Sequence, residues 1–331
     1  MELNGQKSMK VFLTGASGFI GGNLARKLAE NGYEINALVR KSSNLIGLEG
    51  LPVKIFYGDL HDREAIANAV KGCTACFHVA ARYSFWERDN SVFYLSNVEG
   101  TKNILNACRN EGVKKIIYTS SESTVKAEDY EKLNDVSEVH GLYKKTKIMA
   151  ELEVNKFINE GYPVVVVAPT TPVGCWDIKP TPTGKIVLDF MQNKMPAYVN
   201  TGLNIIDVED VALGHIAALE RGTPGKKYIL GNKNLMLKDI FKILSEITKI
   251  KAPTVRIPLW LALGFGYSSE LFSSVLLKKE PQVPVAAVKA ASKFRFFDCS
   301  GSLEKLEIYP GPVEQAFEKA VNWFKDYGYC K

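Results

Sequence analysis

Two side chains near the middle of the chain have a spacing suited to proton transfer. Tyr143 and Lys147 are four residues apart, so a helix places them on one face. A neighbouring ammonium favours the tyrosinate and lowers the phenol pKa from its ordinary ~10, which lets tyrosine act near neutral pH. A solvated helix face is the alternative for this common pattern. Ser121 at the end of a predicted strand adds a hydroxyl for a substrate oxygen, with Ser123 as an alternative, and Asn97 lies in the preceding predicted helix.

A glycine-rich turn near the start of the chain has the pattern of a phosphate-binding loop. The segment 14–21 reads TGASGFIG and lies between a predicted strand and a predicted helix. There, Gly15 permits a tight turn, Gly18 lets the backbone approach a pyrophosphate, and Gly21 lets the helix pack closely on the sheet. The N–H groups at the helix N-terminus then attract the phosphates. A purely structural turn is the alternative, but the position in the first strand–helix unit favours dinucleotide binding.

The end of the second predicted strand indicates which dinucleotide is bound. Enzymes that use NAD commonly carry Asp or Glu about 20 residues after the glycines, where the carboxylate binds the ribose. Here Val39 is followed by Arg40 and Lys41. A guanidinium can bind a 2′-phosphate through two hydrogen bonds, and the lysine adds charge. NADP(H) is therefore favoured as the cofactor, with NAD(H) as the alternative if Arg40 only stacks on adenine or is solvated.

Short β-branched runs alternate with helical patterns through the first half of the chain, which is typical of a parallel sheet covered by helices. We expect an α/β fold, a Rossmann-type doubly wound parallel sheet, whose ligands bind at the carboxyl ends of the strands. Residues 9–172 would form the NAD(P)-binding domain, with 204–232 returning to it, and residues 173–203 and 233–331 a smaller, α-rich substrate-binding region. The predicted strands are 11–14, 33–40, 53–57, 75–80, 116–121 and 163–168, and the predicted helices are 19–31, 62–71, 92–110, 143–160, 184–194 and 313–327.

The composition excludes several classes of protein. The 331 residues are 46% apolar and 24% charged, which excludes a disordered chain, a collagen-like repeat and a small disulfide scaffold. A net charge of +6 is too small to indicate nucleic-acid binding. No apolar signal segment opens the chain, so we expect a cytoplasmic protein with six reduced cysteines. Cys73 and Cys76 form a CxxC pair without further ligands, which predicts packing at a strand edge and no metal site.

An apolar stretch over residues 257–277 is long enough to cross a bilayer, but Pro258, Glu270 and four serines interrupt it. We expect a buried or lid helix there and no integral membrane segment. Contact with a membrane surface is the minority alternative.

Five motifs together resemble those of the extended short-chain dehydrogenase/reductase family. In order they are TGASGFIG at 14–21, HVAA at 78–81, NVEGT at 97–101, YTSS at 118–121 and the Tyr-x-x-x-Lys pair. Segments in the second half extend the resemblance to nearly the whole chain. They are similar to the dihydroflavonol 4-reductase-like branch of the NAD-dependent epimerase/dehydratase superfamily, and most of all to the bacterial hopanoid-associated sugar epimerases.

The resemblance implies a role for each matching residue. Ser121, Tyr143 and Lys147 would be the catalytic triad, with Asn97 supporting a proton-relay water. Residues 59–60 would lie at the adenine, residues 80–81 would line the dinucleotide cleft, and the 169–173 loop would hold the nicotinamide carboxamide. The cofactor-binding residues so implied are Gly15, Ser17, Gly18, Phe19, Ile20, Gly21, Arg40, Asp59, Leu60, Ala80, Ala81, Tyr143, Lys147, Pro169, Thr170, Thr171 and Val173.

Two positions depart from the family pattern. Glu122 stands where the family has an apolar residue, and it is either an added acid/base or a solvated loop charge, the latter being favoured. Cys175 and Trp176 replace a pair of the Gly/Pro type, and Trp176 either forms a wall of the substrate pocket or packs. We expect His78 to pack or to orient backbone at a strand end.

Three functions fit these residues. The favoured one is an NAD(P)(H)-dependent reductase that transfers a hydride reversibly between the cofactor and a ketone or alcohol, through Ser121, Tyr143 and Lys147. The second is a nucleotide-sugar epimerase or dehydratase with retained NAD, for which Arg221 and Arg256 are the only candidates to bind a diphosphate, while Arg295 is a third arginine, in a basic stretch. The third is a non-catalytic dinucleotide sensor. The small-molecule substrate is then hydrophobic or a nucleotide sugar, and a homodimer through the helices 92–110 and 143–160 is expected from the resemblance.

Overall fold

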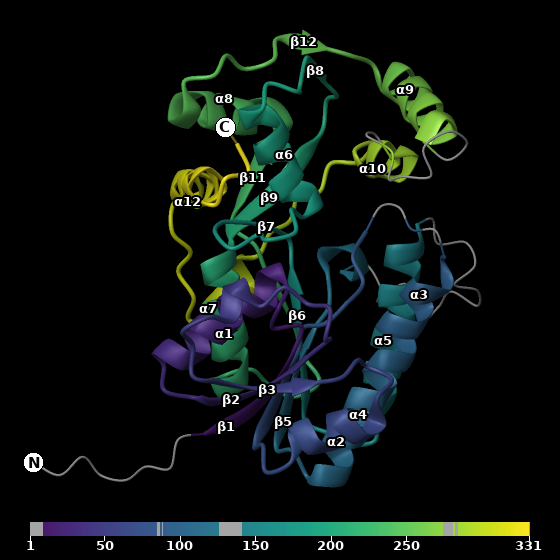
Figure 1. Ribbon diagram of the computed structural model, residues 1–331, viewed down its shortest axis with the longest axis vertical. Helices are drawn as coiled ribbons and strands as arrows, with labels where there is room; N and C mark the ends of the chain where they lie inside the picture. Colours follow the sequence, from purple (N-terminus) through teal and green to yellow (C-terminus); the bar gives the residue numbers. More distant parts are fainter. Residues whose placement is uncertain are drawn as a thin grey trace, which may run out of the picture.

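A parallel sheet of seven strands forms the centre of the fold, in the order β10-β6-β5-β4-β1-β2-β3 (Figure 1). The computed structural model describes residues 9–84, 87, 89–125, 141–273, 281 and 284–330. Because the order reverses between β1 and β4, the sheet has a topological switch point there. The strands are β1 (Lys10–Thr14), β2 (Glu34–Val39), β3 (Val53–Tyr57), β4 (Ala75–His78), β5 (Lys115–Thr119), β6 (Val164–Pro169) and β10 (Lys227–Leu230).

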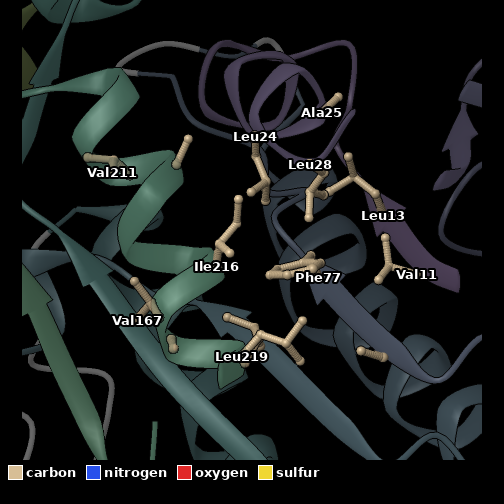
Figure 2. Close-up of a cluster of buried hydrophobic side chains, with 14 of the residues drawn as sticks. Val11, Leu13, Leu24, Ala25, Leu28, Phe77, Val167, Val211, Ile216 and Leu219 are labelled. Carbon is tan, nitrogen blue, oxygen red and sulfur yellow. The ribbon is translucent and has the colours of Figure 1, made fainter. Parts of the chain in front are cut away.

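Helices cover both faces of this sheet, which explains why its central strands are continuously apolar. One face carries α1 (Phe19–Glu30) and α7 (Val208–Glu220), which pack against each other. The other face carries α2 (Arg63–Val70), α4 (Gly100–Glu111) and α5 (Leu142–Asn159). Figure 2 shows the first layer, in which side chains of α1 and α7 meet those of the strands; these include Leu24, Leu28, Val211, Ile216, Leu219, Val11 and Phe77.

The helix predicted over residues 92–110 is divided into three parts. A short α3 (Ser91–Tyr94) leads into a π-helical turn, η2 (Leu95–Glu99), and then into α4. A π-helical turn changes the facing of side chains along a helix and is frequent at functional sites. Here the turn contains Asn97, which is buried.

The second half of the chain builds a smaller unit above the carboxyl edge of the sheet (Figure 1). Its core lies between a three-stranded sheet, in the order β11-β9-β7, and the helices α6, α8 and α12. The elements are β7 (Thr171–Val173), α6 (Pro182–Met191), β9 (Gly202–Asp207), β11 (Lys233–Met236), α8 (Leu237–Thr248) and α12 (Val313–Asp326). The remaining ones are η1 (Ile46–Leu48), η3 (Glu122–Thr124), β8 (Ala197–Tyr198), β12 (Val255–Arg256), α9 (Leu259–Phe272), α10 (Val285–Ala290) and α11 (Ser300–Leu306).

The doubly wound α/β fold expected from the sequence is confirmed, and each of the six predicted strands is present. The seventh strand, β10, was not predicted as an element, although residues 204–232 were expected to return to the first domain. Both α7 and β10 lie in that segment and belong to the layers of the central sheet.

The apolar stretch 257–277 forms α9 up to Phe272, and its residues 274–277 lie outside the described part of the chain. At ~1.5 Å per residue, the 14 residues of α9 are about 21 Å long, short of a ~30 Å hydrocarbon core. Within the described ranges, no helix is long and apolar enough to cross a membrane.

Candidate active site

The carboxyl ends of the parallel strands bring most of the predicted cofactor residues to one edge of the sheet. Thr14, the last residue of β1, pairs with Leu38 of β2 and with His78 of β4, which in turn pairs with Tyr118 of β5. The segments that follow these strands therefore leave the sheet side by side. The switch point between β1 and β4 lies in the middle of this edge, where ligands of such sheets bind.

The glycine turn is held by backbone contacts that leave no room for side chains. Gly15 has a φ of +77°, and a Cβ placed on it would lie 2.7 Å from the backbone nitrogen of Ala80. A Cβ on Gly21 would lie 2.1 Å from the carbonyl oxygen of Gly15. Gly18 caps α1 without a side-chain hydrogen bond, and the first turn of α1 carries no acidic residue. The helix N-terminus is therefore open to an anion.

Arg40 and the segment 59–60 lie at the same edge, beyond β2 and β3. Arg40 directly follows β2 and is exposed. The Asp59 carboxylate accepts the backbone N–H groups of His61 and Asp62, and the Leu60 carbonyl accepts the side-chain amide of Asn103 from α4. These bonds fix the segment next to Arg40, in the place that the sequence assigned to the adenosine end of the cofactor.

His78 has the structural position that the sequence predicted. Its Nδ1 lies 2.8 Å from the Thr14 hydroxyl, and its Nε2 lies 3.0 Å from the Thr101 hydroxyl. The Thr14 hydroxyl also accepts the backbone N–H of Ala80. Burial lowers the pKa of His78 to about 3, and the Lys147 ammonium contributes to the lowering. The neutral imidazole of His78 therefore links β1, β4 and α4 beneath the glycine turn. Ala81, which the sequence predicted to line the dinucleotide cleft, is exposed.

Ser121, Tyr143 and Lys147 come together where β5 ends and α5 begins. The Tyr143 hydroxyl is hydrogen-bonded to Ser121. The Lys147 ammonium is buried and donates to the Thr119 carbonyl at 2.7 Å and to the Tyr118 hydroxyl at 3.0 Å. Desolvation lowers the pKa of Lys147 to about 7.

The pKa of Tyr143 is shifted opposite to the direction expected from the sequence. Burial raises it, and the neighbouring Tyr83 and Glu122 raise it further, while the hydrogen bond with Ser121 lowers it. The expected lowering by Lys147 is absent because that ammonium is held by Tyr118 and Thr119. The hydroxyl of Tyr143 is therefore protonated at neutral pH.

Asn97 is fully engaged by protein groups. Its amide nitrogen donates to the Thr146 hydroxyl at 3.0 Å and to the Arg82 carbonyl, and its amide oxygen accepts the Arg82 backbone N–H at 2.6 Å. The π-helical turn directs Asn97 toward α5, where its partner Thr146 directly precedes Lys147. These contacts give it a role in joining the 82–84 segment to α5, beside the predicted role in proton relay.

Glu122 is not the solvated loop charge that the sequence favoured. Its side chain is 9% exposed, accepts the Ser121 hydroxyl at 2.7 Å and pairs with Arg295 at 3.2 Å. Ser123 also donates to the Ser121 oxygen. Arg295 comes from the second unit and is further hydrogen-bonded to Tyr83, whose ring packs against that of Tyr143 at 4.6 Å. Sequence reasoning missed Tyr83 and named Arg295 only as a third arginine in a basic stretch, beside the two candidates for a diphosphate.

The two arginines that were candidates to bind a diphosphate are not engaged at Tyr143. Arg221 donates to the Leu306 carbonyl and pairs with Glu220 and Glu307, and Arg256 is exposed in β12. Trp176 packs under the Arg26 guanidinium, whose carbon lies 3.5 Å from the ring centre, and against Tyr327 of the C-terminal region. These contacts favour the packing interpretation of Trp176 over a substrate-pocket wall.

The 169–173 segment forms the end of β6 and the start of the second small sheet. Thr170 donates its hydroxyl to the Asn204 amide oxygen, and its backbone N–H donates to the Leu230 carbonyl. Thr171 and Val173 are buried in β7. The segment therefore crosses from the sheet edge to the second unit, where the sequence placed the nicotinamide end of the cofactor.

The residues present fit a nicotinamide dinucleotide. The glycine turn and the uncapped α1 N-terminus provide hydrogen-bond donors for a pyrophosphate. The described part of the chain has no group of three His, Cys, Asp or Glu side chains that could hold a metal ion. Cys73 and Cys76 are free, buried thiols, and burial raises the pKa of Cys73 to about 11.

The lowered pKa of Lys147 predicts a pH-dependent stability. Because its folded pKa of about 7 is below the ordinary ~10.4, the unfolded state binds more protons between these values, and this group makes stability rise with pH in that window. Lys147→Met should remove that part of the rise, as measured by urea unfolding at pH 7 and about pH 9. Lys156→Met, an exposed lysine of the same helix, is the control and should keep the wild-type slope. An unchanged slope in Lys147→Met would contradict the buried ammonium.

Comparisons with known proteins agree with this architecture. The model of the NAD dependent epimerase/dehydratase family matches residues 11–231. The chain is 42% identical over 343 residues to the "Putative dihydroflavonol 4-reductase" of Synechocystis sp., covering 100% of this chain and 99% of that protein. It is 29% identical over 326 residues to "Sterol demethylase protein B" of Methylococcus capsulatus, covering 97% and 99%.

A solved structure is similar over the same length. The crystal structure of gox2253 matches with a TM-score of 0.83 and 39% identity, covering 97% of this chain and 99% of that one. The family model and the relative at 42% identity extend over both the central sheet and the second unit. The chain therefore belongs to the NAD-dependent epimerase/dehydratase family, within the extended short-chain dehydrogenases/reductases whose motifs its sequence carries.

Proposed function

We propose that the protein is an NADP(H)-dependent reductase that transfers a hydride reversibly to a hydrophobic ketone through Ser121, Tyr143 and Lys147. The observation that carries this proposal is the hydrogen bond between Tyr143 and Ser121 at the carboxyl edge of the sheet. Two hydroxyls that meet beside the nicotinamide end of the predicted cofactor site can both bind one substrate oxygen.

The nicotinamide supplies the hydride donor or acceptor, and the chain's own residues manage the oxygen and its proton. The Ser121 hydroxyl, which donates to Glu122 in this structure, would turn that hydrogen bond to the carbonyl oxygen when the substrate enters. Tyr143, whose raised pKa keeps it protonated, donates its proton to that oxygen as the alcohol forms and takes it back in the reverse direction. Lys147 is anchored by Thr119 and Tyr118. From there its ammonium would donate a hydrogen bond to the cofactor ribose.

Relatives and the chain's own surface favour a hydrophobic ketone as the substrate. The related proteins carry names of reductases and of a sterol demethylase, which refer to ring-shaped apolar substrates. The second unit of this chain carries exposed aromatic side chains near its edge, among them Phe294 and Phe296 on either side of Arg295. The alternative, an epimerase with retained NAD, is less favoured because neither diphosphate candidate is engaged at Tyr143: Arg221 pairs with Glu220 and Glu307, and Arg256 is exposed in β12.

Glu122 and Arg295 would act as positioning residues in this reaction. The carboxylate accepts the Ser121 hydroxyl, so Ser121 accepts in turn from the groups that face it. Arg295 holds the carboxylate in place from the second unit. The Glu122–Arg295 pair thereby links the second unit to the position of the Ser121 side chain.

A homodimer through the helices 92–110 and 143–160 remains our proposal from the family resemblance. Tyr94 and Leu95 are exposed on this face of the molecule and give it apolar side chains. A shallow groove there is lined by residues of η2 and α5, which include Val98, Met149 and Leu152.

The cofactor is the first point to test. The purified protein is expected to release no stoichiometric nucleotide on denaturation, and to bind NADPH more tightly than NADH. Arg40→Ser should weaken NADPH binding by about tenfold or more with little effect on NADH, because it removes a charge-assisted pair with the 2′-phosphate. Lys71→Ser, at an exposed position after α2, is the matched control. Near-stoichiometric NAD⁺ on denaturation would overturn the proposal in favour of the epimerase.

The role of Tyr143 is tested by removing one oxygen atom. Tyr143→Phe should keep NADPH affinity and lose turnover with hydrophobic cyclic ketones by about 100-fold or more, because the proton donor is gone. Turnover is followed by the loss of NADPH absorbance. Tyr94→Phe, an exposed tyrosine, serves as the control. Unchanged turnover in Tyr143→Phe would remove this residue from the mechanism.

A double-mutant cycle tests the coupling of Glu122 to Arg295. Glu122→Gln and Arg295→Met should each lower kcat by about tenfold with little change in NADPH affinity, because either change loosens the contact that holds the Ser121 side chain in position. The double variant should lose little more than each single one. Glu153→Gln on α5 is the control for removing a carboxylate. Fully additive losses would show that the two residues act independently.

A further inference from the structure

We propose that α9 docks on the surface of an anionic lipid bilayer and holds the second unit against it. This helix is apolar on all sides, yet few of its side chains are buried. Five large ones are more than half exposed, with Trp260 at 71% and Leu271 at 67%. We call these five residues the α9 face; they are Trp260, Phe265, Tyr267, Leu271 and Phe272.

The α9 face is continuous along the helix. At ~100° per residue, Trp260, Tyr267 and Leu271 fall in one stripe about 40° wide, and Phe265 and Phe272 fall in a second stripe beside it. Gly264 and Ser268, both exposed, lie in the same arc and add no charge. Exposed apolar side chains gathered in this way mark an interaction site, whereas scattered ones do not.

The α9 face belongs to the second unit, outside the layers of the central sheet. Figure 1 shows α9 and α10 as a pair at the outer side of the second unit. The two helices pack against each other, and the Glu270 carboxylate of α9 accepts the backbone N–H of Val285 at the start of α10. This ionic group of α9 is therefore used within the pair and does not interrupt the apolar surface.

The charges around the α9 face select an anionic surface. β12, α9, α10 and residues 291–293 carry three exposed basic side chains, Arg256, Lys289 and Lys293, and one acidic one, Glu270. The Lys289 ammonium lies 6.0 Å from the ring centre of Tyr267, directly beside the face. Aromatic side chains gather at the interface between membrane and water, and a lysine beside them is attracted to anionic headgroups.

The same features disfavour a protein partner and a membrane span. Lysine is depleted in protein interfaces relative to the rest of the protein surface, whereas anionic lipid headgroups attract it. A helix of 14 residues is too short to cross the hydrocarbon core, but an interfacial helix needs to bury its apolar face only ~5–10 Å deep. The docking does not rest on the proposed reductase activity. It would, however, bring the second unit next to a bilayer in which a hydrophobic substrate dissolves.

Flotation with lipid vesicles tests the proposal on the full chain without any substrate. The wild type should float with vesicles of phosphatidylcholine and phosphatidylglycerol, bind far less to phosphatidylcholine alone, and dissociate at high salt. The double variant Trp260→Ser/Leu271→Ser should bind the anionic vesicles about tenfold or more weakly, because it removes two inserted side chains. Tyr309→Ser, which changes an exposed aromatic outside the α9 face, is the matched control and should bind as the wild type does.

Three outcomes would overturn the proposal. These are a wild type that stays unbound with anionic vesicles, a double variant that binds as tightly as the wild type, and concentration-dependent self-association abolished by the double variant without vesicle binding. The last would assign the α9 face to a second copy of this chain. Thermal unfolding and NADPH affinity of the double variant should equal those of the wild type, which separates lost docking from lost folding.

Discussion

The close approach of Gly15 to Ala80 is the contact on which the site depends. A side chain at Gly15 would overlap the backbone after β4, and one at Gly21 would overlap Gly15 itself. The two glycines therefore let α1 begin directly above the switch point of the sheet. Beneath them, the neutral His78 links the hydroxyls of Thr14 and Thr101. An uncapped helix N-terminus is thus fixed in position by backbone packing and by a buried imidazole, without any side chain that would occupy the anion's place.

The proposed catalytic group and the residues that position it are divided between the two units of the chain. Ser121, Tyr143 and Lys147 come from the end of β5 and the start of α5, both in the first unit. Arg295 arrives from the far end of the sequence and pairs with Glu122, while its backbone N–H donates to the Gly202 carbonyl. Lys227 of β10 similarly pairs with the buried Glu151, which accepts the hydroxyls of Ser120 and Thr124. The segment that follows β5 is therefore held by charges on both of its sides.

Local patterns carried most of the fold and part of the site. The β-branched runs and the glycine turn predicted the sheet and its carboxyl edge because these signals lie within a few neighbouring residues. The pairing of Glu122 with Arg295 joins positions 173 residues apart, so no local pattern reveals it. The direction of the Tyr143 pKa shift depends on where the Lys147 ammonium points, which helical spacing leaves open. The π-helical turn at Asn97 likewise has no signature in the sequence.

The order of strands in the central sheet also determines when the fold can be completed during synthesis. β6 is paired on one side by β5 and on the other by β10, whose residues emerge about 60 positions later in the chain. Until then β6 is an open edge of valines, the kind of strand that pairs with other chains. The core of the second unit is completed later still, because its residues Phe317, Val321 and Phe324 belong to α12 near the end of the chain. A ribosome-bound chain thus exposes an adhesive edge while the roughly 60 residues between β6 and β10 are made, and chaperone capture of that edge during this interval would protect its yield.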